Sequence, residues 1–132
     1  MALLGFLGLK LRRRPDPIAV QTAALRREKA EALARLRNSE MPHVDFIDAA
    51  ARVAQIETAL VTGRPVAGID ANAVRASTRL DEKTADVIDD IFSARAELLF
   101  AGGGRDDGRV SPAERERVLG ALKQLERNHA KS

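Results

Sequence analysis

Residues 98–114 contain the end of one helix and the start of the next, and they fix the local architecture of this chain. Apolar residues lead into three consecutive glycines at 102–104, and glycine favours the irregular backbone that follows a last helical turn. Ser111, Pro112 and Glu114 then match the N-cap, first and third positions of a capping box. The stretch therefore predicts a helix, a polar loop and a second helix.

The loop also resembles part of a calcium-binding site, but its residues do not supply the ligands. If Gly108 is taken as the glycine of a calcium loop, Asp107 and Glu114 stand at ligand positions. Gly103 and Arg105 then occupy the first and third positions, where Ca²⁺ needs carboxylate oxygens. We therefore expect a surface loop, and the chain is predicted to need no metal or cofactor.

The remaining helices are predicted from caps, stops and apolar residues at helical spacing. They begin at Asp16–Pro17, at His43 (running to Thr62, before Gly63), after Asp70 (a short piece, about 71–76) and at Asp81–Glu82. Leucine and alanine supply most of the apolar residues, which favours helices over strands. Together with the helix after Ser111, they predict an all-α compact bundle of four main helices plus one short helix.

The apolar positions of these helices define the expected core. They are Ile18, Leu25, Ala32, Leu33, Leu36, Phe46, Ile47, Ala50, Val53, Ala54, Leu60, Val61, Val87, Ile88, Ile91, Phe92, Leu98, Leu99, Val118, Leu122 and Leu125. Glu57 interrupts the apolar face of the second helix. We expect one helical domain over residues 16–128, with a tail at 1–15 that is disordered in isolation and a disordered tail at 129–132.

The amino-terminal residues suggest proximity to a membrane. Residues 1–11 are largely apolar and are followed by Arg12, Arg13 and Arg14. A span of a bilayer needs about 20 apolar residues, and a signal peptide carries its basic residues before the apolar run. Apolar residues followed by arginines are typical of the cytosolic end of a membrane helix. A disordered amphipathic tail is the alternative.

Charge argues against a nucleic-acid partner. The net charge is +3, from 22 basic and 19 acidic residues, and the excess lies mainly at Lys10 and Arg12–Arg14. Without those four residues, 18 basic residues face 19 acidic ones, so the helical part is not basic. The chain has no cysteine, which excludes disulfides, a thiolate nucleophile and cysteine-ligated zinc.

No catalytic set is recognisable. The two histidines, His43 and His129, are far apart and are predicted to lie on the surface. Carboxylates gather on two helices, as Asp45, Asp48, Asp86, Asp89 and Asp90, and are predicted to form the solvated faces of those helices. The sequence therefore predicts a protein that is not an enzyme.

From Asp45 onward the chain resembles the C-terminal cytoplasmic region of BatD-type aerotolerance proteins, which are bacterial membrane proteins. The resemblance is carried by residues 46–55, 62–64, 69–70, 80–81 and 94–102, the last reading Ala-Arg-Ala-Glu-Leu-Leu-Phe-Ala-Gly. It implies partners among von Willebrand A-domain proteins and a MoxR-type AAA+ ATPase. It also implies a location at the cytoplasmic face of the inner membrane, and it supplies no catalytic residues.

Three hypotheses for function follow. The first is a non-enzymatic cytoplasmic protein-interaction domain of a Bat-type membrane protein, whose loop charges Arg105, Asp106 and Asp107 would contact the partner. The second is a ligand- or metal-responsive helix–loop–helix module. The third is an unrecognised hydrolase.

Overall fold

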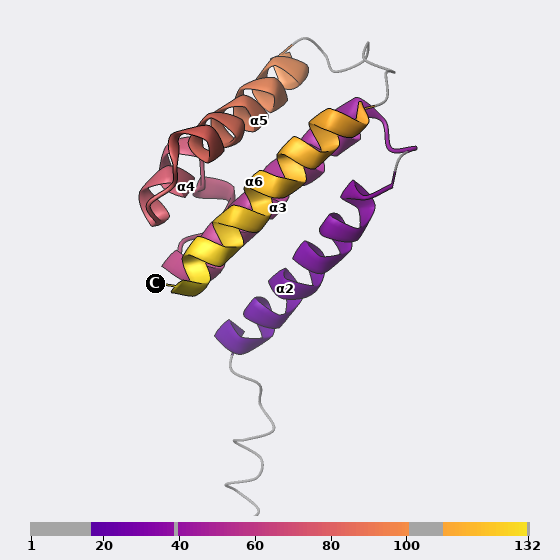
Figure 1. The fold of residues 1–132 in the computed structure, drawn as a ribbon. Helices are drawn as coiled ribbons and strands as arrows, with labels where there is room; N and C mark the ends of the chain where they lie inside the picture. Colours follow the sequence, from indigo (N-terminus) through magenta and orange to yellow (C-terminus); the bar gives the residue numbers. More distant parts are fainter. Residues whose placement is uncertain (1–16, 39, 101–109, 132) are drawn as a thin grey trace, which may run out of the picture.

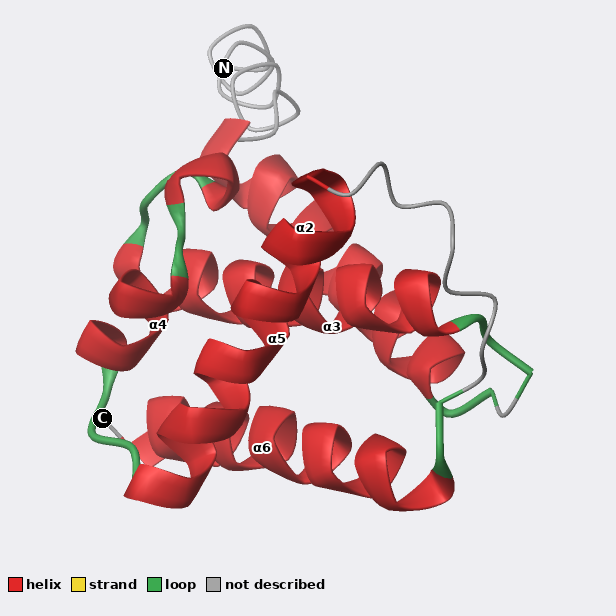
Figure 2. Ribbon diagram, turned by 90° about the horizontal axis from the view of Figure 1, so that it is seen from above, coloured by secondary structure: helices red, strands yellow, loops and turns green. Residues whose placement is uncertain are grey.

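The computed structural model describes residues 17–38, 40–100 and 110–131, and these are almost entirely helical (Figure 1). The elements are α2 (Pro17–Leu36), α3 (His43–Thr62), the 3₁₀ turn η1 (Val66–Gly68), α4 (Ala71–Ser77), α5 (Glu82–Phe100) and α6 (Pro112–Lys131). No strand occurs among the described residues (Figure 2). The predicted all-α bundle of four main helices and one short helix is confirmed.

Helix ends lie close to where the caps and stops predicted them. Gly63 ends α3 in the left-handed conformation, with φ 75°. The Asp70 carboxylate accepts a hydrogen bond of 2.8 Å from the backbone N–H of Ala73 and thereby caps α4. The Ser111 hydroxyl accepts one of 3.1 Å from the N–H of Glu114 at the start of α6. These bonds satisfy N–H groups that a first helical turn leaves without intrahelical partners.

The carboxyl-terminal end of α6 corrects the predicted domain boundary. A disordered tail was expected from residue 129, but α6 continues to Lys131 and His129 is buried, with 7% of its surface exposed. His129 follows Val118, Leu122 and Leu125 on one face of the helix, at spacings of three and four residues. The buried face of α6 therefore extends one turn further than the apolar residues alone indicate.

Helix α3 lies at the centre of the bundle, and α2, α4, α5 and α6 all pack against it (Figures 1 and 2). Twelve of its residues are buried. Phe46 and Ile56 are its largest fully buried side chains, and the run Ala49–Ala51 brings small side chains into the core. Small side chains let neighbouring helices approach closely. The core therefore forms on several sides of α3, with α2 on one side and α5 and α6 on others.

Helix α2 packs mainly on α3, and among its residues 19–36, whose side chains the structure describes, only Ala32 and Leu36 are buried. Polar contacts add to this interface. Arg52 of α3 donates hydrogen bonds to both carboxylate oxygens of Glu28, one of them 3.1 Å long. The hydrogen bond from Arg52 holds the pKa of Glu28 below its usual range. The flank of α2 that faces away from α3 is left without a covering helix in the described structure.

Most of the expected core is buried, but two predicted core residues are exposed. Val61 is 46% exposed and Leu99 is 72% exposed. Both lie near the ends of their helices, and helical spacing alone does not reveal whether another helix continues far enough to cover a last turn. The side chain of Ile18 lies outside the described residues.

Several predicted features fall on residues that the structure does not describe. The tail at 1–15 with Arg12, Arg13 and Arg14 is one, and the loop charges Arg105, Asp106 and Asp107 are another. Within the described ranges, no helix has both the length and the apolar character needed to cross a membrane.

Candidate functional site

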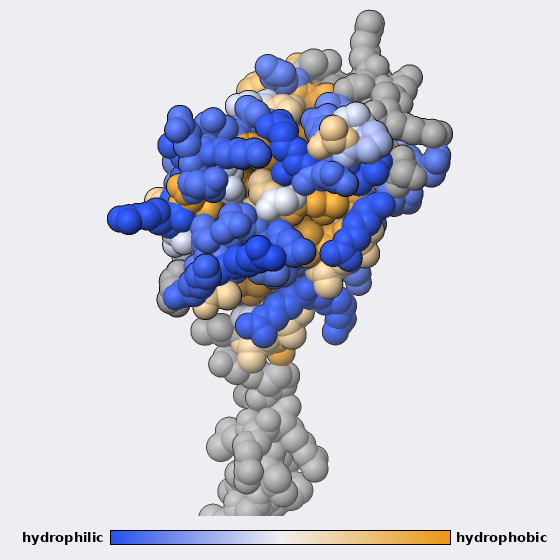
Figure 3. All heavy atoms as spheres, in the orientation of Figure 1, coloured by the Kyte–Doolittle hydropathy of each residue, from blue (hydrophilic) through white to orange (hydrophobic). Residues whose placement is uncertain are grey.

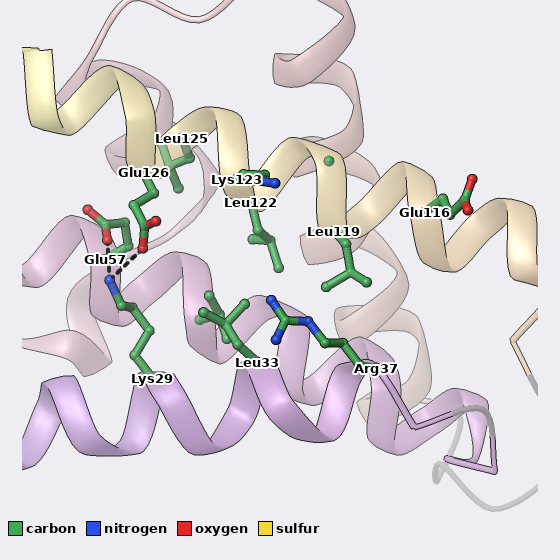
Figure 4. A pocket seen from close by; sticks show the side chains of 12 residues that line it. Lys29, Leu33, Arg37, Glu57, Glu116, Leu119, Leu122, Lys123, Leu125 and Glu126 are labelled. Carbon is green, nitrogen blue, oxygen red and sulfur yellow. Dashed lines mark hydrogen bonds and ion pairs between the residues drawn. The ribbon is translucent and has the colours of Figure 1, made fainter.

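A groove runs between α2 and α6 over the surface of α3, and we call it the α2–α6 groove (Figure 4). Its volume is about 380 Å³. Leu33 from α2, Val53 from α3 and the leucines 119, 122 and 125 from α6 give it an apolar floor and walls. Figure 3 shows apolar surface here, between charged side chains. The groove exists because α2 and α6 each pack on α3 with little contact between themselves.

The apolar residues of the groove differ in how much the fold covers them. Val53, Leu122 and Leu125 are buried in the core. Leu33 and Leu119 project from opposite walls and are only partly buried (Figure 4). These two leucines are therefore the apolar groups that a bound molecule would cover further, and each buried CH₂ would contribute about 0.8 kcal/mol.

One end of the α2–α6 groove is closed by a lysine that joins three helices. Nζ of Lys29 lies 2.7 Å from Oε1 of Glu57 on α3 and 3.0 Å from Oε2 of Glu126 on α6 (Figure 4). Burial works against the charge of Lys29, but the hydrogen bonds to both glutamates outweigh it and raise the pKa of Lys29. The lysine is therefore charged over the physiological range and ties α2 to α3 and α6.

Three further charged side chains at the groove rim, unlike Lys29, are not held in ion pairs within the described part of the chain. Arg37, in the turn just after α2, and Lys123 and Glu116 on α6 line the groove, and no ion pair is recorded for these three side chains among the described residues. Figure 4 shows the Arg37 guanidinium reaching from the end of α2 toward the apolar floor. Aliphatic stems of such residues can pack on apolar surface while the charged head stays solvated.

Beneath the closed end, a buried chain of hydrogen bonds continues from Glu57. Oε2 of Glu57 lies 2.7 Å from Nδ1 of His129, and Nε2 of His129 lies 2.7 Å from Oγ of Ser77. Ser77 ends α4, so the chain joins α3, α6 and α4. The sequence prediction that His129 lies on the surface is wrong, because its side chain finds two polar partners inside the bundle.

The order serine, histidine, carboxylate is that of a hydrolase triad, which sequence reasoning did not find. In such a triad the serine hydroxyl donates its proton to the imidazole. Here Oγ of Ser77 also lies 2.6 Å from the carbonyl oxygen of Val74, to which it donates. A hydroxyl has one proton, so Ser77 then accepts from His129 rather than donating to it. This arrangement favours a structural tie over a nucleophile.

The signal for this buried chain was present in the sequence. Glu57 interrupts an apolar helix face, and His129 continues the apolar spacing of α6. Taken separately, each of these two polar residues is predicted to lie on the surface. Their pairing became visible only when the fold brought α3 and α6 together.

Three of the five aspartates singled out on the second and third long helices form ion pairs at the surface. Asp89 lies 3.3 Å from Arg75, Asp90 lies 3.3 Å from Arg117, and Asp48 lies 3.4 Å from Arg95. Asp45 and Asp86 are exposed. Each arginine belongs to a different helix from its aspartate, so these residues link neighbouring helices. Their solvated placement agrees with the prediction.

A metal centre is not assembled from the described residues. No group of three or more histidine and carboxylate side chains there could hold an ion. His43 is partly buried, and its Nε2 lies 3.9 Å from Oε1 of Glu114. Gly103, Arg105 and Asp107 of the loop that resembles a calcium site lie outside the described residues.

Comparisons of the chain with protein-family models, with curated proteins and with solved structures give no match. The resemblance to BatD-type proteins therefore stays a prediction.

Proposed function

We propose that this chain is a non-enzymatic protein-interaction domain and that the α2–α6 groove is its docking surface. The observation that carries this proposal is an apolar floor left open between two helices that share α3. Recognition grooves of this kind combine an apolar floor with a polar rim that sets orientation. Leu33 and Leu119 would supply the contact area, and Arg37 and Lys123 would supply the rim.

The resemblance stated above adds a biological setting to the proposal. It implies a domain at the cytoplasmic face of the inner membrane, in a protein of the Bat aerotolerance type. Its partners would then be von Willebrand A-domain proteins or a MoxR-type AAA+ ATPase.

Site-specific photocrosslinking in the native host tests the proposal. A photoreactive amino acid replaces Leu119 in the groove, and in a matched control it replaces Lys83, which is exposed on α5 outside the groove. The expected result is a crosslink to a defined protein from position 119 and none from position 83. A second variant, Leu33→Glu, should remove that crosslink while the circular dichroism spectrum stays helical.

A loop variant separates the groove from the competing surface. Replacing residues 102–109 by a neutral glycine–serine linker removes Arg105, Asp106 and Asp107. If the crosslink from position 119 survives this replacement, the groove is the docking surface. If the loop replacement abolishes partner capture while Leu33→Glu does not, docking uses the loop and our assignment of the groove is wrong.

A further inference from the structure

Gly120 lies in the middle of α6, in the wall of the α2–α6 groove, and no contact within the described structure explains a glycine there. A Cβ built on Gly120 would meet no heavy atom within 4 Å, and its φ is not positive. Glycine inside a helix is less favourable than alanine by about 1 kcal/mol. No contact in the described structure therefore requires this glycine, and it leaves α6 backbone bare where α6 lines the α2–α6 groove and a second hollow beside α5.

We propose that the α2–α6 groove binds an acidic amphipathic helix that packs closely against α6 at Gly120. This inference rests on the proposed function and adds the chemistry of the partner. Its grounds are the bare backbone at Gly120, the dimensions of the groove and the charges at its rim.

The dimensions of the groove suit a short helix. The residues of α6 that line it run from Glu116 to Glu126, which at 1.5 Å per residue corresponds to about 15 Å. A helix of two to three turns covers this length and presents apolar side chains at i, i+3 or i+4, and i+7. The distance between packed helix axes depends on the side chains at the contact. A contact at Gly120 therefore lets the backbones of α6 and the bound helix approach closely. The apolar side chains of the bound helix can then reach Leu33 and Leu119.

The rim charges select for acidic residues on that helix. Lys29 is already engaged by Glu57 and Glu126. Three cations and three carboxylates line the groove in all, but Glu57 and Glu126 lie at the Lys29 end and Glu116 lies at the other end (Figure 4). Arg37 and Lys123 have no ion pair among the described residues, so the middle of the groove is positive. Carboxylates on the partner would complement these two cations. This complementarity would change the association rate and the specificity more than the total affinity.

The probe is a fluorescent synthetic peptide of about 15 residues, long enough for partial helix formation in water. It carries leucines on one face and glutamates beside them, and a companion peptide carries lysine in place of every glutamate. Binding to the full chain is followed by anisotropy, and the contact surface by amide shifts in NMR spectra. We expect saturable binding that weakens with salt, shifts centred on residues 119–123, and at least tenfold weaker binding of the lysine peptide.

Substitution of Gly120 provides the sharpest test, because stability and binding should change in opposite directions. Gly120→Ala should raise the melting temperature and weaken binding of the glutamate peptide at least tenfold. Gly68→Ala is the matched control: its Cβ also meets nothing within 4 Å, and Gly68 lies outside the groove. It should leave binding unchanged. Arg37→Glu should weaken binding of the glutamate peptide without unfolding the chain.

Three results would overturn the inference. The first is equal binding of the peptide by the chain with Gly120→Ala and by the unaltered chain. The second is equal binding of the two peptides, and the third is that phosphatidylglycerol vesicles, but not the peptide, shift residues 119–123. If crosslinking from position 119 still captures a protein while the glutamate peptide fails to bind, the proposed docking function stands and only this partner chemistry fails.

Discussion

Nδ1 of His129 lies 2.7 Å from Oε2 of Glu57, so two side chains 72 residues apart in the chain meet in the interior of the bundle. The other carboxylate oxygen of Glu57 accepts from Lys29, and His129 continues to Ser77. Glu57 thereby connects α3 to α2, α6 and, through His129, to α4. Buried charges are tolerated when they are paired and hydrogen-bonded, and the removal of one partner is costly.

Loss of the Glu57 charge should therefore destabilise the fold. Glu57→Gln leaves Lys29, which is 17% exposed, with Glu126 as its remaining recorded carboxylate partner. We expect the free energy of unfolding to fall by about 3 kcal/mol, the lower end for breaking a buried ion pair. Glu126→Gln is the control, because Glu126 is largely exposed; its effect should stay within about 1 kcal/mol. Urea denaturation measures both, and equal losses would contradict the central role of Glu57.

Alkaline pH should weaken the attachment of α2 through Lys29. Its pKa is raised above the usual value of 10.5 in the folded state. A group with a raised folded-state pKa contributes stability that is fully present below the unfolded pKa and is lost as pH rises through the folded pKa. The stability advantage of the unaltered chain over Lys29→Met should therefore shrink above pH 10.5. Urea denaturation measured across this range checks the prediction, with Lys83→Met, at an exposed position on α5, as the matched control.

Truncation of Leu122 should be far more costly than truncation of its neighbour in the groove. Leu122 is 3% exposed in the core, so Leu122→Ala should lower the free energy of unfolding by about 2–5 kcal/mol. Leu119 is only partly buried, and Leu119→Ala should cost clearly less. Chemical denaturation compares the two. A change below about 0.5 kcal/mol for Leu122→Ala, typical of surface positions, would mean that α6 does not pack as described.

The cap at the start of α4 offers a local test. Asp70→Ala removes the carboxylate that accepts from the N–H of Ala73, and the expected loss is about 1 kcal/mol. Asp86→Ala, at an exposed position on α5, should change the free energy of unfolding by less than about 0.5 kcal/mol. Thermal or urea unfolding of the two variants checks the prediction. If the two substitutions have equal effects, the capping hydrogen bond of Asp70 adds no measurable stability to the fold.

Helix boundaries could be predicted from the sequence because they are set within a few residues. The capping side chains of Asp70 and Ser111 and the left-handed Gly63 each act on backbone groups in the adjacent turn. The class of fold followed from the same local signals, together with apolar residues spaced for helices. The end of α6 was misplaced because its last buried residue, His129, is polar.

The candidate site depended on which helices face one another, and local signals do not contain that information. The α2–α6 groove arises because α2 and α6 pack on α3 with little contact between themselves. The exposure of Val61 and Leu99 has the same origin, since no described helix covers them. The sequence by itself determined where helices start and stop and which face of each is apolar. Only the tertiary structure decided which apolar residues stay open and that Glu57 meets His129, because burial and pairing depend on side chains that come from distant parts of the chain.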